Sequence, residues 1–490
     1  MFCRKSPKFY FTKRYRTILS GMLAATLLLA SSLSVTAAPL TAEEEARVRQ
    51  HQSMPVQTNE ITNWPAGPIV GAESAILMEA ETGAILYAKN IHQKQFPASI
   101  TKILTTLMMT EMCELDEMVT FSHDAVFDTP RDSNHIAMDV GQALTIEQCL
   151  NAILIRSANE VAFAAAEHIS GSTDWSVFAD LMNKRAKELG CLNTHFVNPN
   201  GLPDDDHYTT CYDMAMIGKA FFANEMLCKI TMSRRLEIPA SDTVPQSKLE
   251  MNAMQIIPGK KYSYEHLVGC KTGFTETARY SLVSCAQKGD LKLICVVMND
   301  ENPYQYEDTI SLFNYGFSNF QKINISEQET KFDLSGGEMF HYGIDIFASS
   351  QPLLSLNKDD VIILPTTLTL DQLESSVTYT EEENTAATIS YTYGGMELGD
   401  VKVHFTSAVN HLPHEDGETS ENVRPVPSPE RTSFIPINIL TLVLIILGLG
   451  VLGFVVVFFR AALKNYQESR IRTSSRRRWR QQNRRRRRRY

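Results

Sequence analysis

Two long uncharged apolar runs, one near each end of the chain, most constrain how this sequence can fold. Residues 18–35 and residues 434–459 contain no charged side chain, and basic residues adjoin both runs. Apolar segments of this length are typical of secretion signals and membrane spans rather than of a globular surface. The stretch between the two runs is therefore the part that folds in water.

The N-terminal run has the three-part layout of a secretory signal. Six Lys or Arg residues and no acidic residue lie within residues 1–38, and the apolar run ends in small residues at Ala37 and Ala38. We expect residues 1–38 to be a signal peptide that is cut after Ala37 or Ala38. An uncleaved signal anchor remains the alternative, because the apolar run is long for a signal. In both cases the body of the protein is exported.

The C-terminal run is long enough to cross a bilayer. Residues 439–459 alone would extend about 31 Å as a helix, so we predict a transmembrane helix over 433–459. The tail that follows, 460–490, carries fourteen basic residues and one acidic residue. The positive-inside rule places this tail in the cytoplasm and the body outside, giving a single-pass protein of the cell membrane. The tail either contacts anionic lipid as a strong stop signal or binds a specific cytoplasmic partner.

Between these ends the body is acidic and divides by pattern. Residues 39–459 hold 27 basic and 55 acidic side chains, which would repel phosphate and exclude a nucleic-acid partner. The pattern predicts a polar leader, a mixed α/β domain, a small all-β domain and a proline-containing linker. In chain order these cover residues 39–63, 64–325, 326–407 and 408–432.

The α/β part has a recognisable order of elements. The sequence predicts a hairpin over 74–88, and helices over 100–112, 145–169, 175–189 and 309–320, the second of them interrupted near Ser157. It also predicts strands over 267–271, 280–286 and 291–298.

The cysteines leave the redox state open. Nine are present, and Cys3 would leave with the signal, so eight remain in the body. An even number in an exported protein permits disulfides, but a large domain does not need them, so bridging and buried thiols both remain. No Cys or Cys/His group has the spacing of a zinc site, and we expect no metal.

Three short motifs carry the chemistry. A spacing of three residues places Ser99 and Lys102 on one face of a helix. A serine hydroxyl needs a base to become a nucleophile, and a lysine can serve if burial or a neighbouring cation keeps it neutral. The first two motifs are common by chance and the third is rarer. All three in this order in an exported chain make up the set found in class A β-lactamases and penicillin-binding proteins. The motifs are Ser99-Ile100-Thr101-Lys102, Ser157-Ala158-Asn159 and Lys271-Thr272-Gly273.

The chain resembles the low-molecular-weight penicillin-binding proteins, which are D-alanyl-D-alanine carboxypeptidases, over about 64–405. The resemblance implies an α/β, β-lactamase/transpeptidase-like domain, in which an antiparallel sheet carries a helical subdomain, followed by the small all-β domain. It implies an enzyme that needs no cofactor. The resemblance is carried by residues 97–102, 157–159, 193–202, 207–209, 268–275 and 314–317.

The resemblance also implies a role for each site residue. Ser99 attacks the carbonyl between two D-alanines of a peptidoglycan stem peptide, and Lys102 takes its proton. Ser157 relays protons and Asn159 holds the peptide amide. Lys271 keeps the site electropositive, and Thr272 orients the substrate. Gly273 completes the third motif, and the N–H groups of Ser99 and Phe274 form the oxyanion hole. β-Lactams would acylate the same serine and act as inhibitors.

Some positions depart from the family pattern. Ala158 and Arg279 stand where the family has glycine, and Gln305 replaces a basic residue that could hold the substrate carboxylate. Arg279 either substitutes for that residue or the affinity is weaker. We expect His195 and His207 to be structural hydrogen-bonding groups. Two alternatives remain, a β-lactamase and a non-catalytic, membrane-anchored peptidoglycan-binding protein.

Overall fold

The computed structural model describes residues 40–325, 354–357, 359–380 and 385–405. The expected signal peptide, the linker, the transmembrane helix, the arginine-rich tail and the first part of the small β-domain lie outside the described residues. Within the described ranges, no helix combines the length and the apolar character that a membrane crossing requires. All eight cysteines of the body are described, and all are free thiols.

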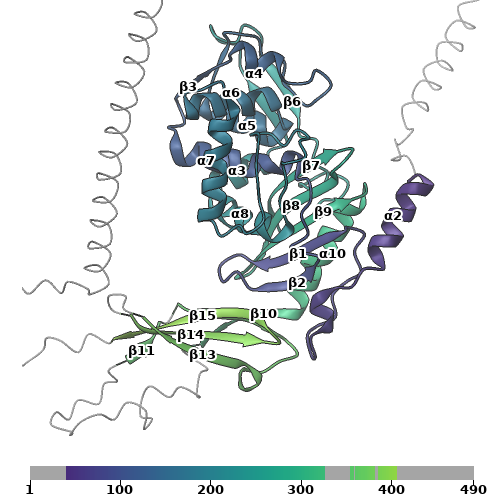
Figure 1. Ribbon diagram of the computed structural model, residues 1–490, viewed down its shortest axis with the longest axis vertical. Helices are drawn as coiled ribbons and strands as arrows, with labels where there is room; N and C mark the ends of the chain where they lie inside the picture. Colours follow the sequence, from purple (N-terminus) through teal and green to yellow (C-terminus); the bar gives the residue numbers. More distant parts are fainter. Residues whose placement is uncertain (1–39, 326–353, 358, 381–384, 406–490) are drawn as a thin grey trace, which may run out of the picture. The chain divides into compact units, whose positions relative to one another are not determined.

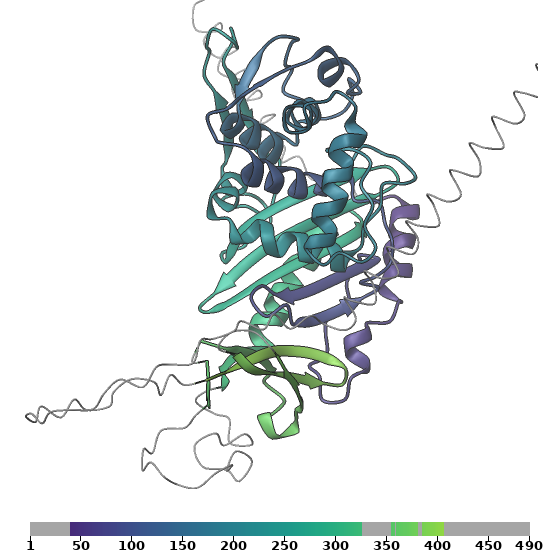
Figure 2. The same cartoon turned by 60° about the vertical axis from the view of Figure 1, so that its left-hand side comes forward.

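A five-stranded antiparallel sheet forms the centre of the α/β domain (Figures 1 and 2). Its strand order is β2-β1-β9-β8-β7, so β1 pairs with the last of the three later strands and β2 lies at the edge. The predicted hairpin and the three predicted strands are confirmed. Their bounds are β1 Ser74–Glu79, β2 Ile85–Lys89, β7 Leu267–Thr275, β8 Arg279–Lys288 and β9 Leu291–Asp300.

The two faces of this sheet are covered by different helices. Side chains alternate between the faces of a strand, and in β9 the neighbours Leu293 and Ile294 belong to two separate apolar clusters. Leu293 lies against α10 (Tyr304–Asn319) and Ile294 against α8 (Cys211–Ala223). The closing helix begins five residues earlier than we predicted, directly after Pro303, a residue that favours helix starts.

The helical subdomain extends from the α8 face (Figure 1). The predicted helices over 100–112 and 175–189 are confirmed, and the predicted interruption falls between α5 and α6 at Ser157. Two short ribbons, β3–β4 and β5–β6, were not predicted. The helices are α3 Lys102–Met112, α4 His123–Phe127, α5 Ile146–Arg156, α6 Asn159–Ser170, α7 Trp175–Glu188 and α9 Glu225–Met232. The ribbon strands are β3 Met118–Thr120, β4 Ala143–Thr145, β5 Arg235–Ile238 and β6 Lys248–Met251.

The polar leader is helical, which the sequence pattern did not indicate. Helix α2 (Ala42–Gln52) starts with a capping box, in which Thr41 and Glu44 bond each other's backbone N–H groups. The buried side chains Val48 and His51 face the domain, and His51 Nδ1 lies 3.0 Å from the Gly71 carbonyl. A single turn, η1 (Gln57–Glu60), follows.

The described strands beyond the closing helix are antiparallel. Strand β10 (Phe320–Asn324) pairs with β12 (Val361–Pro365), and a four-stranded sheet has the order β11-β15-β14-β13. Tyr393 donates from its hydroxyl to the Thr62 carbonyl (3.1 Å), which ties β14 to the leader. The bounds of the other strands are β11 Leu354–Leu356, β13 Glu374–Tyr379, β14 Thr385–Tyr393 and β15 Met396–Phe405.

Candidate active site

The first motif lies where a short 3₁₀ turn becomes a helix. Residues Ala98–Thr101 form the turn η2, and α3 begins at Lys102. This places Lys102 Nζ 3.1 Å from Ser99 Oγ. A direct contact between a hydroxyl and an amine is the arrangement that a serine nucleophile and its base require.

Lys102 is fully buried, and its other contacts orient it. Its Nζ lies 2.7 Å from Asn159 Oδ1 and 2.6 Å from the Asn200 carbonyl oxygen. A neutral amine has two N–H donors and one lone pair. Donation to Asn159 and Asn200 uses both donors, so the lone pair faces the Ser99 hydroxyl. Burial, and secondarily the charge of Lys271, hold the pKa of Lys102 well below its ordinary value.

The second motif is a sharp break between two helices. Ser157 ends α5 in the left-handed conformation (φ 59°, ψ 32°), and Asn159 is the first residue of α6. The break lets both side chains reach the same site, Asn159 toward Lys102 and Ser157 toward Lys271. Ala98, which precedes Ser99, also has a positive φ of 50°. Non-glycine residues in this region store strain, and such strain clusters at functional sites.

The third motif lies in the edge strand β7. The buried Lys271 donates from Nζ to Ser157 Oγ (3.0 Å) and to the Thr272 carbonyl oxygen (2.7 Å). Burial lowers the pKa of Lys271 to about 7. Thr272 is half-buried in the next position of the strand. The structure thus brings all three motifs together through side-chain contacts.

Gly273 lets β7 lie directly against the turn that carries Ser99. A Cβ at this position would be 2.8 Å from the Pro97 carbonyl oxygen and 3.2 Å from the backbone nitrogen of Ser99. Any larger residue would push the strand away from the turn. Phe274, the next residue, is 41% exposed and packs against Tyr280 (ring centroids 4.4 Å apart).

The loop of residues 198–201 contacts Lys102 through a backbone carbonyl, and the sequence motifs give this loop no role in the site. Asn198 Oδ1 accepts the N–H of Gly201 (2.7 Å), which shapes the loop so that the Asn200 carbonyl points at Lys102. Gly201 has φ of +80°, and a Cβ there would be 1.8 Å from the Ala98 carbonyl oxygen. In the sequence, the one sign that this loop matters is that residues 193–202 are among the segments that resemble the penicillin-binding proteins.

His207 is a structural group. Its Nδ1 accepts the Val197 N–H (3.1 Å), so its Nε2 carries the proton that it shares with Thr101 Oγ1 (2.9 Å). Burial lowers the pKa of His207 to about 3, which keeps the ring neutral. His195 contacts the Asp206 carbonyl through Nδ1.

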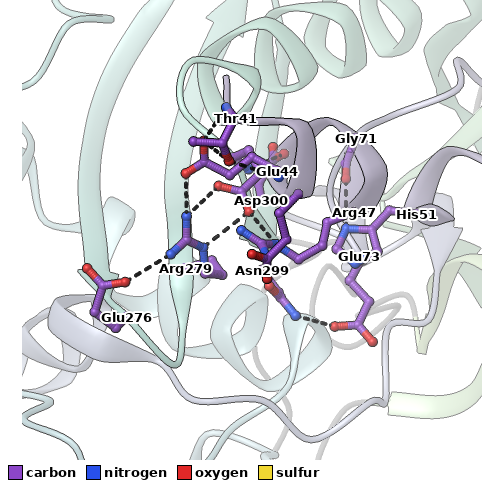
Figure 3. Close-up of polar contacts among 12 residues, drawn as sticks. Thr41, Glu44, Arg47, His51, Gly71, Glu73, Glu276, Arg279, Asn299 and Asp300 are labelled. Carbon is purple, nitrogen blue, oxygen red and sulfur yellow. Dashed lines mark hydrogen bonds and ion pairs between the residues drawn. The ribbon is translucent and has the colours of Figure 1, made fainter. Parts of the chain in front are cut away.

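Arg279 is held by carboxylates, so its charge is already paired (Figure 3). It lies at the start of β8, and its guanidinium contacts Glu44 (3.0 Å), Glu276 (3.2 Å) and Glu301 (2.8 Å). Gln305 is buried and uncharged. Arg279 therefore does not offer a free cation to a substrate carboxylate, and the replacement that the sequence left open is disfavoured.

A pocket of about 410 Å³ opens beside the turn that carries Ser99. Phe96 lies on one side of it, and Thr277 and Ala278, from the turn after β7, lie on another. Lys94 and Tyr208 also line the pocket, and Lys94 Nζ lies 4.1 Å from the centroid of the Tyr208 ring. None of the residues of the three motifs lines this pocket, so it is a neighbour of the site and not the site itself.

Comparisons with known proteins agree with this geometry. Residues 61–302 match the family model of D-alanyl-D-alanine carboxypeptidase, Peptidase S11. The chain is 34% identical over 257 residues to the D-alanyl-D-alanine carboxypeptidase DacF of Bacillus subtilis, covering 51% of this chain and 63% of that protein. It is 28% identical over 279 residues to DacA of Escherichia coli, covering 54% and 65%. The chain thus spans just under two thirds of these relatives.

Solved structures show the same fold. Penicillin binding protein 5 of Haemophilus influenzae superposes with a TM-score of 0.53 at 24% identity, covering 69% of this chain and 98% of that one. Penicillin binding protein 6B of Escherichia coli gives 0.51 at 22% identity, covering 70% and 98%. These likenesses confirm the β-lactamase/transpeptidase-like fold, with its antiparallel sheet and its helices.

Proposed function

We propose that this chain, whose residues 61–302 belong to the Peptidase S11 family of D-alanyl-D-alanine carboxypeptidases, removes the terminal D-alanine from peptidoglycan stem peptides. The observation that carries the proposal is the contact of Ser99 Oγ with the buried amine of Lys102, whose two N–H groups are taken by Asn159 and Asn200. An amine held in this way is oriented to accept the serine proton.

Acylation follows from these contacts. Ser99 Oγ forms a bond to the carbonyl carbon of the penultimate D-alanine, and its proton moves to Lys102 Nζ. The C–N bond then breaks, and the proton held by Lys102 passes to the leaving amine through Ser157, which Lys271 contacts, so that Lys102 is neutral again. A water molecule next attacks the ester carbonyl and gives a proton to Lys102. The bond to Ser99 Oγ then breaks, Lys102 returns this proton to Ser99, and the shortened peptide leaves as a carboxylic acid.

The developing oxyanion would be stabilised by the backbone N–H groups of Ser99 and Phe274. The close approach that Gly273 permits supports this role, because it brings β7 to within contact of the Ser99 nitrogen. One such donor is worth about 3–4 kcal/mol of the barrier. Asn159 would hold the peptide amide, and Thr272 would orient the substrate. A β-lactam ring would acylate Ser99 by the same attack.

The proposal also includes export and anchoring in the cell membrane. The apolar runs over 18–35 and 434–459 support a signal peptide and a single span, with the enzyme outside and the tail inside. Protease added outside intact cells should digest the body and spare a tag fused after Tyr490. Cleavage of that tag from outside would reverse the orientation.

Labelling and product release test the enzyme proposal together. The full chain, purified in mild detergent, should bind fluorescent penicillin covalently and release D-alanine from purified muropeptides. Ser99→Ala should abolish both activities, whereas Ser133→Ala, on an exposed turn, should retain both.

Each alternative predicts a different outcome of the same assays. Rapid turnover of penicillin without D-alanine release would indicate a β-lactamase. Neither labelling nor release by the wild-type chain would indicate a non-catalytic binding protein.

A further inference from the structure

A second group of reactive side chains lies at the opposite ends of two helices from the Ser99 site. One ligand atom each from Cys113, Glu117 and His168 lies within 4.8 Å of the other two. Cys113 follows α3, Glu117 precedes β3, and His168 lies in the last turn of α6. Their spacing in the sequence is not that of a zinc motif, so only the fold reveals the group.

The backbone around the group is fixed. The N–H of Cys113 donates to the Met109 carbonyl (3.2 Å), which holds the cysteine at the end of α3. Glu117 Oε1 accepts the N–H of Glu114 (2.6 Å), while Glu117 Oε2 lies 3.0 Å from His168 Nε2. The carboxylate is thus held from behind by a group that would act as an outer-shell partner.

The group is also reachable from solvent. The side chains of Glu117 and His168 are 41% and 27% exposed, and Cys113 is half-buried. A cation could therefore enter from one side and keep a water molecule on that side.

An ordinary ion pair explains only part of this arrangement. The contact of His168 Nε2 with Glu117 Oε2 does not involve Cys113, although a ligand atom of each of the three residues lies within 4.8 Å of the others. A cation among the three groups would bind the thiolate, the imidazole and the carboxylate together.

We propose that Cys113, Glu117 and His168 bind one zinc ion, with a water molecule as the fourth ligand. A thiolate, an imidazole and a carboxylate form a set that suits zinc, whereas calcium and magnesium take oxygen ligands. Tetrahedral zinc places its donor atoms about 3.4–3.7 Å apart. The three ligand atoms now lie within 4.8 Å of one another, so side-chain movements of about 1 Å would bring them to this separation. Binding would release the thiol proton of Cys113.

The position of this site gives it a structural role. Helix α3 begins with Lys102 and α6 begins with Asn159, and these two residues meet in the candidate active site. Cys113 follows Lys102 by eleven positions and His168 follows Asn159 by nine, so the zinc site lies about 14–17 Å along the helices from that meeting point. The zinc ion would therefore join the far ends of the two helices and fix their relative position without touching the substrate.

Cobalt substitution provides the most direct test. The full chain, in mild detergent and a non-thiol reductant, is freed of metal and titrated with Co²⁺. We expect a thiolate-to-cobalt charge-transfer absorption that saturates at one equivalent, and that one equivalent of Zn²⁺ displaces. Cys113→Ser should remove this absorption, and Cys191→Ser, at another partly buried free thiol, should leave it unchanged. A wild-type chain without the absorption, or a Cys113→Ser chain that retains it, would overturn the proposal.

Zinc affinity and stability provide a second, independent readout. A chelator competition should give a wild-type dissociation constant in the micromolar range or tighter, weakened at least about tenfold in His168→Gln and Glu117→Gln. Zinc at a hundred times this constant should raise the melting temperature by about 5 °C, and Mg²⁺ should not. Penicillin labelling of Ser99 checks that each variant is folded. If Cys113→Ser does not label, the other two variants decide, and unchanged zinc affinity in both would refute the site.

Discussion

Replacing the buried Lys271 by methionine should abolish activity and yet stabilise the protein near neutral pH. In the folded chain this lysine is fully buried on β7, and burial lowers its pKa from the ordinary 10.5 to about 7. In the unfolded chain it faces water and keeps its ordinary pKa. Burying the ammonium is therefore a cost that the fold bears for its site, and a methionine of similar length does not incur it.

The size and sign of this effect follow from proton linkage. Between pH 7 and pH 10.5 the unfolded chain binds the Lys271 proton and the folded chain has largely lost it. The unfolded state thus holds more protons, and the free energy of unfolding of the wild type rises with pH. At about 1.4 kcal/mol per pKa unit, the cost is about 4 kcal/mol at pH 7 and disappears near pH 10.5.

Two hydrogen bonds work in the opposite direction. The variant loses the contacts of Lys271 with Ser157 and with the Thr272 carbonyl, each worth about 1 kcal/mol. The net gain of Lys271→Met should therefore be about 2 kcal/mol at pH 7. It should fall to zero near pH 9 and become a loss above that pH. Removing Lys271 also relieves the charge repulsion on Lys102, which adds in the same direction at neutral pH.

Urea unfolding followed by intrinsic fluorescence, at pH values from 7 to 10, measures this difference. Lys288→Met is the matched control, because Lys288 is exposed at the far end of β8 and should show no pH-dependent gain. Destabilisation by Lys271→Met at pH 7, or a gain that does not change with pH, would refute the view that this lysine is buried at a cost.

Three further predictions concern the base, the strand contact and the arginine cluster. Lys102→Arg replaces the amine by a guanidinium that cannot give up its proton, so penicillin acylation followed by stopped-flow fluorescence should slow by about a thousandfold or more; a near-wild-type rate would move the base to another group. Gly273→Ala would place a methyl group 2.8 Å from the Pro97 carbonyl oxygen, so acylation should fall about 100-fold or more while far-ultraviolet circular dichroism is unchanged; full activity would show that β7 need not lie so close. Glu301→Gln removes the charge of a side chain that is 2% exposed and contacts two arginines, so urea unfolding should show a loss of about 2–4 kcal/mol. An unchanged midpoint in that variant would mean that the cluster contributes no net stability.

Local sequence pattern predicted the elements that depend on local causes. Two short apolar runs on either side of Glu81-Thr82-Gly83 predicted the hairpin of β1 and β2, and the turn between them contains Gly83 at φ +81°. The break between α5 and α6 was visible because a serine and an asparagine interrupt an apolar helical stretch at Ser157. The three motifs were visible because serine and lysine side chains carry chemistry that the residue type itself reveals.

Other parts of the site were invisible to that approach for physical reasons. The carbonyl of Asn200 that orients Lys102 is a backbone group, which every residue possesses, so no residue type marks it. Helix α2 has charged residues around most of its surface and little apolar periodicity, so its sequence lacks the apolar stripe by which an amphipathic helix is predicted. It is held instead by its capping box and by ion pairs to residues more than two hundred positions away. Long-range charge pairs of this kind leave no periodic signal.

The same long-range pairs explain how the leader bears on the catalytic strand. Arg279 starts β8 in the left-handed region (φ 52°) and pairs with Thr275, the last residue of β7. Glu44 from α2 contacts its guanidinium at 3.0 Å (Figure 3), and the buried Glu301 after β9 contacts it at 2.8 Å. Arg47 from the same helix also contacts Glu301 at 2.8 Å, so one carboxylate receives both arginines. The turn after the third motif is thereby fixed by a helix that lies outside the matched family region, and the precise placement of Phe274 depends in part on the leader.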